Sequence, residues 1–374
     1  MALAANSNRF TILETEVDRL RQELAIPGLS MAVVQSQEVV FARGWGHADL
    51  ERQIPAAPDT PYQIDSLTKP FAAAVLMKLV EQGRLSLDDS IAEILHDEVF
   101  ALGPRGQVSR DYHNYCQRIR ELSEDPSLPF AFLLQDYRGD TEPVTVRHHL
   151  THTAQGVPGT TYCYNGFLFG ALASVLEKVS GQPFRDLIVE HITAPLGMTD
   201  TVPGATEMQE QQVLARQAKY YRAHGSGFEP SDWPPPEWIE AMERCGLDST
   251  PSLNAGAGMI SNVLDLAKFD AAMDRDAIVS AQSKALMFAA TRSNSGERRP
   301  YGLGWFIQDS DNHRLVWHNG DAPGAHSSLL FKVPAADHTL ILLANSDGAS
   351  SPFDLTKGNV LDSPFARLFL HWLP

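Results

Sequence analysis

Strand-like segments lie at both ends of this chain, and the long middle of the sequence reads as helical. Near the start, residues 29–35 and 38–44 are rich in Val, Met, Phe and Leu and are separated by a short polar turn, which predicts an antiparallel hairpin. Four more strand candidates follow near the end, at residues 302–308, 314–318, 327–333 and 339–345. The pattern predicts a single sheet assembled from both ends of the chain, which leaves few folds open.

Helical spacing predicts one helix over residues 10–24 and another over residues 364–372, at the two ends of the chain. We therefore expect an α+β fold (an α/β sandwich) in which an antiparallel sheet is flanked by these terminal helices. A mostly helical subdomain would be inserted in the middle, with a cleft between it and the sheet. In this scheme residues 1–374 form one domain, with a sheet part at about 1–64 and 250–374 and a helical part at about 65–249.

Two stretches of the middle part lack a clear periodic pattern. Residues 97–144 mix turn-forming segments with one helix predicted over 112–122, and we interpret the stretch as an insertion that shapes or covers the cleft. The Pro-rich run at residues 232–238 is predicted to be a loop, because consecutive prolines do not continue a helix. Between these two stretches, a helix is predicted over about residues 167–179.

The segment Asp65-Ser66-Leu67-Thr68-Lys69 opens a long apolar helix that ends before Gly83. Residues three apart share a helix face, so the hydroxyl of Ser66 and the amine of Lys69 can come within hydrogen-bond distance. A lysine can take the serine proton at neutral pH only if burial or nearby positive charge lowers its pKa. Free backbone N–H groups at the helix start could also hold an oxyanion. The alternative is a capping serine followed by a solvated lysine.

Acidic residues outnumber basic residues by 46 to 30, which gives a net charge of −16, and no run of Lys or Arg interrupts this balance. Affinity for phosphates depends on clustered cations, so we expect neither nucleic acid nor an anionic membrane surface as a partner. We prefer a solvated acidic surface as the explanation of the charge over steering of a cationic substrate.

The cysteines and histidines give no sign of a disulfide framework or a metal site. The three cysteines are scattered, and no CxxC pair occurs. His148, His149 and His152 have ligand-like spacings, but no carboxylate or further histidine completes the set, so we interpret them as structural residues and expect no metal or cofactor. The first residues lack a basic segment followed by a long apolar core, and we expect a cytoplasmic protein unless a signal has been removed.

Several stretches together resemble the serine β-lactamase-like superfamily, on the branch that contains class C β-lactamases, D,D-peptidases, D-aminopeptidases, family VIII carboxylesterases and related acyltransferases. The resemblance covers about residues 10–347. Ser66-Leu67-Thr68-Lys69 matches the family's S-x-x-K motif. Further landmarks are Val146-Arg-His-His-Leu-Thr-His-Thr, Pro195-Leu-Gly-Met-Thr-Asp-Thr and Ala257-Gly-Met-Ile-Ser.

The second family motif, Y-x-N, is identified by its register. Pro158-Gly-Thr-Thr-Tyr-Cys-Tyr matches the family's P-G-T-x-F-x-Y run, which places the catalytic tyrosine at Tyr164 and makes Tyr162 a packing aromatic. The motif is then Tyr164-Asn165-Gly166, with glycine where β-lactamases and D,D-peptidases carry asparagine. That asparagine contacts the acylamide of the substrate in the family, so Gly166 weakens the case for β-lactam or peptide recognition. Family esterases tolerate this position better.

The third motif, K-T-G in β-lactamases, resembles His318-Asn319-Gly320 in this chain. A His-x-Gly version is similar to those of D-aminopeptidases, some D,D-peptidases and many esterases. Gly320 would allow substrate to lie close against the strand backbone. The resemblance implies an oxyanion hole formed by the N–H groups of Ser66 and Asp321.

Tyr164 offers a second candidate for the base. It could act as a phenolate if Lys69 and another positive or donor group, such as His318, face it. It would then take the proton of Ser66 and later return it to the leaving group. The sequence leaves open whether Lys69 or Tyr164 is the base.

The resemblance implies a serine hydrolase that acts through a Ser66 acyl-enzyme resolved by water, and we favour a carboxylesterase acting on small esters. A D-amino-acid amidase, D-aminopeptidase or D,D-peptidase-like amide hydrolase is the alternative, followed by an acyltransferase with an alcohol or amine acceptor. A non-catalytic binding protein is less favoured because Ser66, Lys69 and Tyr164 are all present. The expected partner is a small ester or amide, and the sequence defines neither its acyl group nor the oligomeric state.

Overall fold

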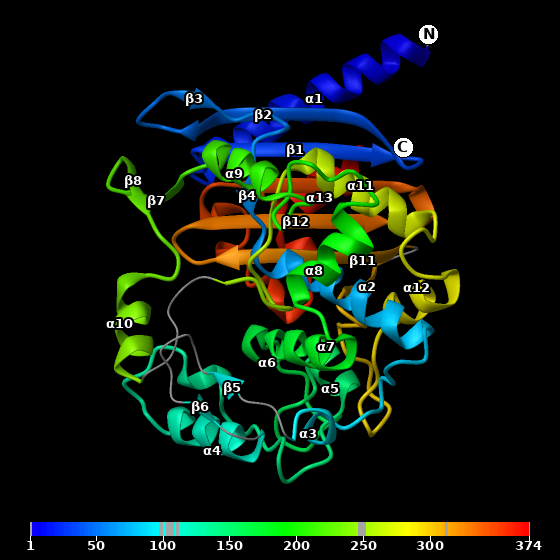
Figure 1. Ribbon diagram of the computed structural model, residues 1–374. Helices are drawn as coiled ribbons and strands as arrows, with labels where there is room; N and C mark the ends of the chain where they lie inside the picture. The colour runs from blue at the N-terminus through cyan, green and yellow to red at the C-terminus, as the bar shows by residue number, and fades with distance from the viewer. Residues whose placement is uncertain are drawn as a thin grey trace.

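A seven-stranded antiparallel sheet forms the centre of the protein in its computed structural model, which describes residues 2–96, 100–101, 108–109, 112–245, 252–310 and 313–373 (Figure 1). The strand order is β10-β11-β12-β13-β1-β2-β3. The first half of the chain supplies β1 (Gly28–Gln35), β2 (Glu38–Asp49) and β3 (Ile54–Pro55); the end supplies β10 (Phe306–Ser310), β11 (His313–Ala322), β12 (His326–Val333) and β13 (His338–Ala344). β1 pairs with β13, so both ends of the chain meet in one sheet. The predicted fold class is confirmed.

The first of the four C-terminal strand predictions was wrong at its start, because β10 begins at Phe306 and not at Gly302. The residues before it form a tight turn in which the N–H of Gly302 donates to the carbonyl of Trp305. Gly304 in this turn has a φ of +80°, a conformation that glycine adopts without steric cost. Local glycine geometry therefore overrides the strand propensity of this stretch.

Alternating side chains of β12 show which helices cover the two faces of the sheet. Phe331 packs against Phe369 of α13 (Pro364–Trp372), with ring centroids 5.8 Å apart. The next residue, Lys332, points to the opposite face and contacts α11 (Val263–Asp274). The helix α1 (Ala2–Glu23) lies beside α13, so these two helices share one face while α11 covers the other. The predicted terminal helices are both present, although α1 begins earlier than expected.

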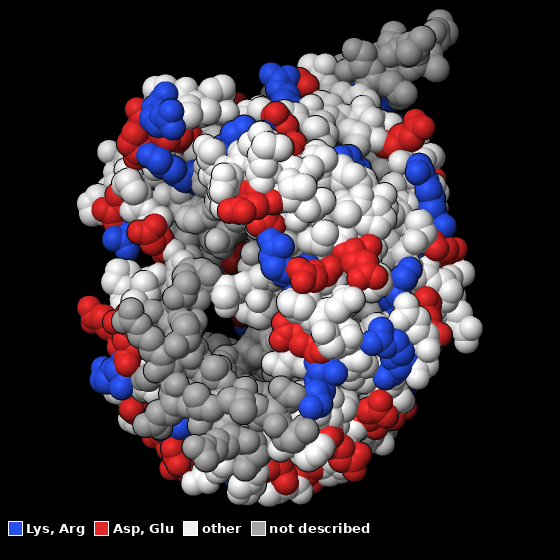
Figure 2. All heavy atoms as spheres, viewed as in Figure 1, with Lys and Arg blue, Asp and Glu red and all other residues white. Residues whose placement is uncertain are grey.

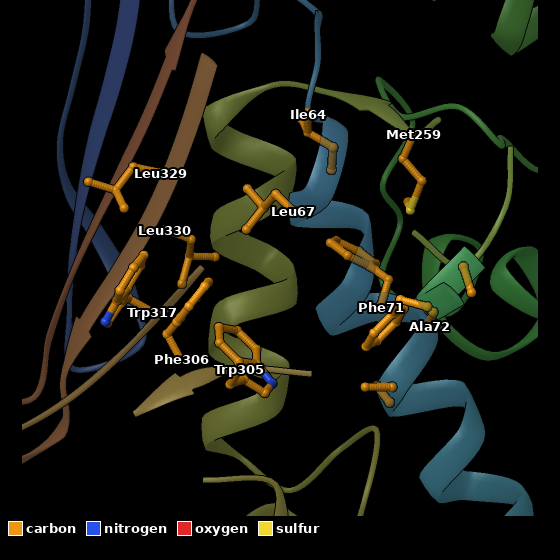
Figure 3. Packing of buried hydrophobic residues seen from close by; sticks show 14 of the residues in the cluster. Ile64, Leu67, Phe71, Ala72, Met259, Trp305, Phe306, Trp317, Leu329 and Leu330 are labelled. Carbon is orange, nitrogen blue, oxygen red and sulfur yellow. The ribbon is translucent and has the colours of Figure 1, made fainter. Parts of the chain in front are cut away.

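A second helical layer lies beyond α11 and carries the Ser66 segment. A short 3-10 turn, η1 (Asp65–Leu67), leads directly into α2 (Thr68–Glu81). Phe71 of α2 stacks on Phe269 of α11 with ring centroids 3.8 Å apart. Figure 3 shows the apolar side chains that fill the space between α2, α11 and the sheet. Residues 68–77 are all buried, so the first turns of α2 have no solvent-exposed side.

Most of the remaining elements form the lower part of the molecule and its flanks in Figure 1, and a few are drawn at the height of the sheet. The helices there are α3 (Ile91–Ile94), α4 (Tyr112–Ser123), α5 (Val146–Leu150), α6 (Gly166–Gly170), α7 (Leu172–Ser180), α8 (Phe184–Ile188), α9 (Glu207–Arg216), α10 (Pro236–Arg244) and α12 (Ala281–Met287). Three short strand pairs accompany them: β4 (Tyr62–Gln63) with β9 (Ile260–Ser261), β5 (Phe100–Ala101) with β6 (Val108–Ser109), and β7 (Tyr220–His224) with β8 (Gly227–Ser231). The helix predicted over residues 112–122 corresponds to α4, and the one predicted over 167–179 is divided at Ala171 into α6 and α7.

Two predictions for the middle of the chain need correction. The run at residues 232–238 is a loop only in part, because α10 begins at Pro236, where proline at the first helical position loses no hydrogen bond. The β7–β8 hairpin was not predicted, and its turn contains Gly225 with a φ of +58°. Within the proposed insertion at residues 97–144, the segments 97–99, 102–107 and 110–111 lie outside the described residues.

The surface carries charges of both signs. Figure 2 shows acidic and basic side chains interspersed over the face in view. Among the residues that the structure describes, no helix is both long enough and apolar enough to cross a membrane.

The buried ion pair between β12 and α11 offers a test of the packing. Nζ of Lys332 contacts carboxylates of both Asp270, whose side chain is fully buried, and Asp274, whose side chain is 26% exposed. Asp270→Asn should lower the free energy of unfolding by about 3 kcal/mol, because it leaves a buried cation without its closest charged partner. Asp274→Asn, the matched control, should cost about 1 kcal/mol or less. Equal losses in urea denaturation would contradict this description of the pair.

Candidate active site

Ser66 and Lys69 meet at the junction of η1 and α2. Nζ of Lys69 donates a hydrogen bond to Oγ of Ser66 at 2.7 Å, the contact that their spacing along a helical turn predicts. Nζ also donates to the carbonyl of Gly256 at 2.9 Å. Gly256 was not predicted as a site residue, because it contributes only a backbone carbonyl from a distant loop. The amine is thus held in place from two sides.

The environment of Lys69 favours its neutral form. The side chain is completely buried, and Nζ lies 5.0 Å from the ring centroid of Tyr164 and 5.5 Å from that of Phe169. Burial lowers the pKa of Lys69 to about 7, while the nearby carboxylate of Asp65 acts in the opposite direction. Near neutral pH, a substantial fraction of the amine is therefore unprotonated and able to accept the proton of Ser66.

The phenol of Tyr164 is the third group at this point. Its hydroxyl lies close enough to Ser66 for the serine side chain to offset part of the strong rise that burial causes in the pKa of the phenol. The hydroxyl of Tyr162 donates instead to the carbonyl of Thr356 at 3.1 Å. The structure therefore brings Tyr164, and not Tyr162, to Ser66. With its raised pKa, Tyr164 is protonated at neutral pH.

His318 is buried beside the site but is engaged with other groups. Its Nδ1–H donates to the carbonyl of Asn319 at 2.7 Å, which leaves Nε2 to accept a hydrogen bond from the hydroxyl of Tyr301, also at 2.7 Å. Burial and the proximity of Lys69 lower the pKa of His318 well below its ordinary value, so the ring is neutral. His318 therefore supplies neither the positive charge nor the hydrogen-bond donor that the sequence hypothesis placed opposite Tyr164. Tyr301, its partner, was missed because no motif marks it.

The space over Gly320 is occupied by the protein itself, which changes the interpretation of this glycine. A Cβ at Gly320 would lie 2.2 Å from the carbonyl oxygen of Ile64 and 2.4 Å from Oγ of Ser328. The residue is glycine because the turn that carries Ser66 packs directly on the strand. Asn319 points to the other face of the strand, where its Nδ2 donates to Oγ of Ser350 at 2.8 Å.

Asp321 lies on the part of β11 that has one free edge. β10 pairs with β11 only as far as Trp317, so residues 318–322 pair with β12 but not with β10. The backbone of β11 contacts η1, which places Asp321 near the start of α2. The carboxyl of Asp321 accepts a hydrogen bond from Oγ of Ser351 at 2.6 Å, and burial raises its pKa to about 7.

Gly166 begins α6 next to the amine of Lys69. A Cβ at this position would lie 3.6 Å from Nζ of Lys69, at ordinary contact distance. Asn165 before it is buried and caps α6, since its Oδ1 accepts a hydrogen bond from the N–H of Leu168 at 2.9 Å. Its Nδ2 donates to Oε1 of Gln155 at 2.9 Å. Asn165 therefore serves the local structure, and Gly166 contributes no side chain to the site.

The three clustered histidines have separate structural contacts. His148 accepts a hydrogen bond from the N–H of Thr145, in a capping box. The two ring nitrogens of His149 contact the hydroxyl of Tyr137 and the carbonyl of Leu168. Nδ1 of His152 accepts a hydrogen bond from the N–H of Asn165, while its Nε2 has no partner among the described residues. In that same part of the chain, no group of three His, Cys, Asp or Glu residues could hold a metal ion.

Two glycines of the site are expected to respond differently to alanine. Gly320→Ala should lower the free energy of unfolding by about 1 to 3 kcal/mol or more, because the added methyl group would overlap the carbonyl of Ile64. Gly166→Ala should cause no loss of stability, because the new methyl group finds ordinary contact distances at a helix start. Urea denaturation of the two variants checks the difference. Similar losses would mean that Ile64 does not pack on the strand as described.

Comparisons with known proteins agree with this fold. The chain is 25% identical over 356 residues to "Penicillin-binding protein 4*" of Bacillus subtilis (strain 168), which covers 91% of this chain and 72% of that protein. The structure resembles EstCE1, described as a hydrolase with promiscuous acyltransferase activity, with a TM-score of 0.67, 20% identity and coverage of 95% of this chain and 98% of that one. It also resembles D-amino acid amidase from Ochrobactrum anthropi SV3, with a TM-score of 0.63, 21% identity and coverage of 98% and 97%.

The matches cover a larger share of this chain than of its curated relatives. The chain spans 60% to 72% of the length of several curated relatives that it matches. In the chain itself, the family model described as Beta-lactamase matches residues 13–363. Because this match includes nearly the whole chain, the protein belongs to the beta-lactamase family of serine hydrolases.

Proposed function

We propose that the protein is a carboxylesterase that hydrolyses small esters through an acyl-enzyme on Ser66. The observation that carries the proposal is the buried amine of Lys69, hydrogen-bonded to Oγ of Ser66 at 2.7 Å and with its pKa lowered to about 7. A serine hydroxyl needs a base beside it to become a strong nucleophile, and an ordinary lysine is protonated at neutral pH. The environment of this lysine removes that obstacle.

Acylation begins when neutral Lys69 accepts the proton of Ser66 as Oγ forms a bond to the carbonyl carbon of the ester. The carbonyl oxygen then carries the negative charge, and the N–H groups of Ser66 and Asp321 are proposed to stabilise it. Collapse of this intermediate breaks the bond to the leaving alcohol, which takes a proton. The acyl group remains on Ser66.

Tyr164 is proposed to transfer protons and not to act as a standing phenolate, because the pKa of its buried phenol is raised. Its hydroxyl can donate a proton to the leaving oxygen while it receives the proton held by Lys69. In the second half of the reaction, a water molecule loses a proton to the same pair and attacks the acyl carbon. Release of the carboxylic acid then restores Ser66. The structure therefore favours Lys69 over Tyr164 as the base of the free enzyme.

The preference for esters rests on the absence of a side-chain amide at Gly166, beside Lys69. Gly166 presents no side-chain amide to the substrate, and the side chain of Asn165 is used to cap α6. An ester has no amide N–H that needs a hydrogen-bond partner. It therefore loses less binding free energy than an acylamide in a site without a side-chain amide. The similarity in fold to EstCE1 agrees with an esterase, and an alcohol or amine could replace water as the acceptor.

An amidase acting on amino-acid amides is the second candidate, and one observation favours it. Two carboxyl groups, those of Asp65 and Asp321, lie close enough to Tyr164 to influence its pKa. A carboxylate near the nucleophile could attract the ammonium group of an amino-acid amide. The fold is also similar to that of a D-amino acid amidase.

A panel of chromogenic substrates separates these activities. Purified protein is expected to hydrolyse short-chain p-nitrophenyl esters faster than D-amino-acid p-nitroanilides, and Ser66→Ala should abolish both the hydrolysis and labelling by a fluorophosphonate, since no nucleophile remains. Strong anilide turnover with negligible ester turnover would reverse the order of the two candidates. Undiminished hydrolysis by Ser66→Ala would reject both of them.

The two neighbouring tyrosines give a matched comparison. Tyr164→Phe should reduce kcat by a factor on the order of 10² or more, because it removes the proton donor for the leaving group. Tyr162→Phe loses only the hydrogen bond to the carbonyl of Thr356 and should stay within a few-fold of wild type. Steady-state kinetics on the best ester of the panel measures both. A large loss in Tyr162→Phe with an active Tyr164→Phe would show that the roles are assigned the wrong way round.

A further inference from the structure

The residue that precedes Ser66 has an unusual backbone conformation. Asp65 has a φ of +45°, a region that residues with a side chain rarely occupy, although Asp and Asn do so more readily than most. Such a conformation persists only where the surroundings hold it. Asp65 is also buried, so its carboxylate needs a partner inside the protein.

β12 supplies two side chains that hold this turn. Oγ of Ser328 donates to the carbonyl of Ile64 at 2.9 Å. Two residues earlier on the same face of the strand, Nε2 of His326 lies 2.7 Å from Oδ2 of Asp65. Both contacts are possible because Gly320 on the neighbouring strand leaves room for the turn.

His326 is completely enclosed, and its contact with Asp65 is shielded from solvent. Its side chain has no exposed surface, and the ring of Tyr220 covers it with centroids 4.4 Å apart. The Nε2 and Oδ2 atoms lie 2.7 Å apart but are not aligned as a regular hydrogen bond, and Nδ1 has no partner among the described residues. The imidazole therefore has one close polar neighbour, the carboxylate next to the nucleophile.

We propose that His326, acting through Asp65, is a positioning residue for Ser66. The imidazole holds the carboxylate, the carboxylate holds the turn at its positive φ, and the turn aims Oγ of Ser66 at the position of the substrate carbonyl. This inference rests on the proposed role of Ser66 as the nucleophile. It adds a link from β12 to the site that no motif in the sequence indicates.

Asp65 also contributes its charge to the site. Its carboxylate raises the pKa of Lys69, against the larger effect of burial. The other ionisable groups that face the pair are Asp321 of β11, with Asp347 of η5 (Asp347–Ala349) behind it, Tyr220 of β7, and Tyr164. If Asp65 is made neutral, the pKa of Lys69 should fall further, so the base should be available at lower pH.

The experiment measures the rate at which a fluorophosphonate labels Ser66 as a function of pH. Labelling forms the Oγ–P bond as the P–F bond breaks and the serine proton passes to Lys69, so it reports the nucleophile whatever the natural substrate is. In wild type, the rate should rise with pH through about 7, as Lys69 loses its proton, and then level off. The variants are His326→Ala, His326→Gln, Asp65→Asn and Asp65→Gly. His338→Ala, which removes a buried imidazole from β13, is the matched control.

The expected results separate the effect of the His326–Asp65 contact from the effect of the Asp65 charge on Lys69. His326→Ala should lower the plateau rate by about 10- to 100-fold, the scale of a misplaced reacting group, and His326→Gln should recover most of the loss because its Nε2 reaches the same carboxylate. Asp65→Asn keeps the turn and should keep the plateau, but its rise should move to lower pH. Asp65→Gly adopts the positive φ readily but has no carboxylate for His326 to contact. It should therefore show both the lower plateau rate and the rise at lower pH.

Three outcomes would overturn the proposal. The first is a His326→Ala variant that is labelled at the wild-type rate with an unchanged pH profile. The second is an equal loss in the folded His338→Ala control, which would indicate a general effect of cavities in the sheet. The third, which applies even if His326→Ala does not fold, is an Asp65→Gly variant whose plateau rate equals that of wild type, because this variant lacks the carboxylate that His326 contacts. Wild-type protein that is not labelled at all would instead reject the proposed nucleophile.

Discussion

A primary amine kept out of water is the feature on which the arrangement around Ser66 depends. Lys69 has no exposed surface, and its contacts are the hydroxyl of Ser66, the carbonyl of Gly256 and the faces of two aromatic rings. An ammonium group is costly in such surroundings, and the carboxylate of Asp65 offsets only part of that cost, so the proton is released more easily. The packing that forms the core around α2 is therefore also what lowers the pKa of the proposed base.

The sheet contributes to the site mainly through its backbone and its small side chains. β10 stops opposite Trp317, which leaves the last residues of β11 free on that edge. Gly320 allows the turn before α2 to approach the strand, and Ser328 on β12 fastens it. The distance between the serine and the sheet is thus fixed by close packing and one hydrogen bond, while the proposed catalytic side chains come from the helical layer.

Contacts between near neighbours in the chain could be predicted, and contacts between distant segments could not. The Ser66–Lys69 contact follows from their spacing of three residues along a helical turn, and the α+β fold follows from the strand patterns at both ends of the chain. Tyr164 was found only because a family run fixed its register. The contacts of Tyr301 with His318 and of His326 with Asp65 depend on strand register and side-chain packing, which the sequence alone does not give. The close contact of Gly320 with the carbonyl of Ile64 is a further role of this glycine that the sequence did not indicate.

The burial of α2 has a consequence for motion. Its first turns are enclosed by α11, the aromatic rings near Tyr164 and the loop at Gly256, so Lys69 cannot swing out to solvent as a surface lysine does. Exposure of the whole Lys69 side chain would require the surrounding layers to separate, so we expect it to cost more free energy than movement of a surface loop. Ser66 and Lys69 thus lie in a closely packed layer of the molecule, where the core restricts the motion of both side chains.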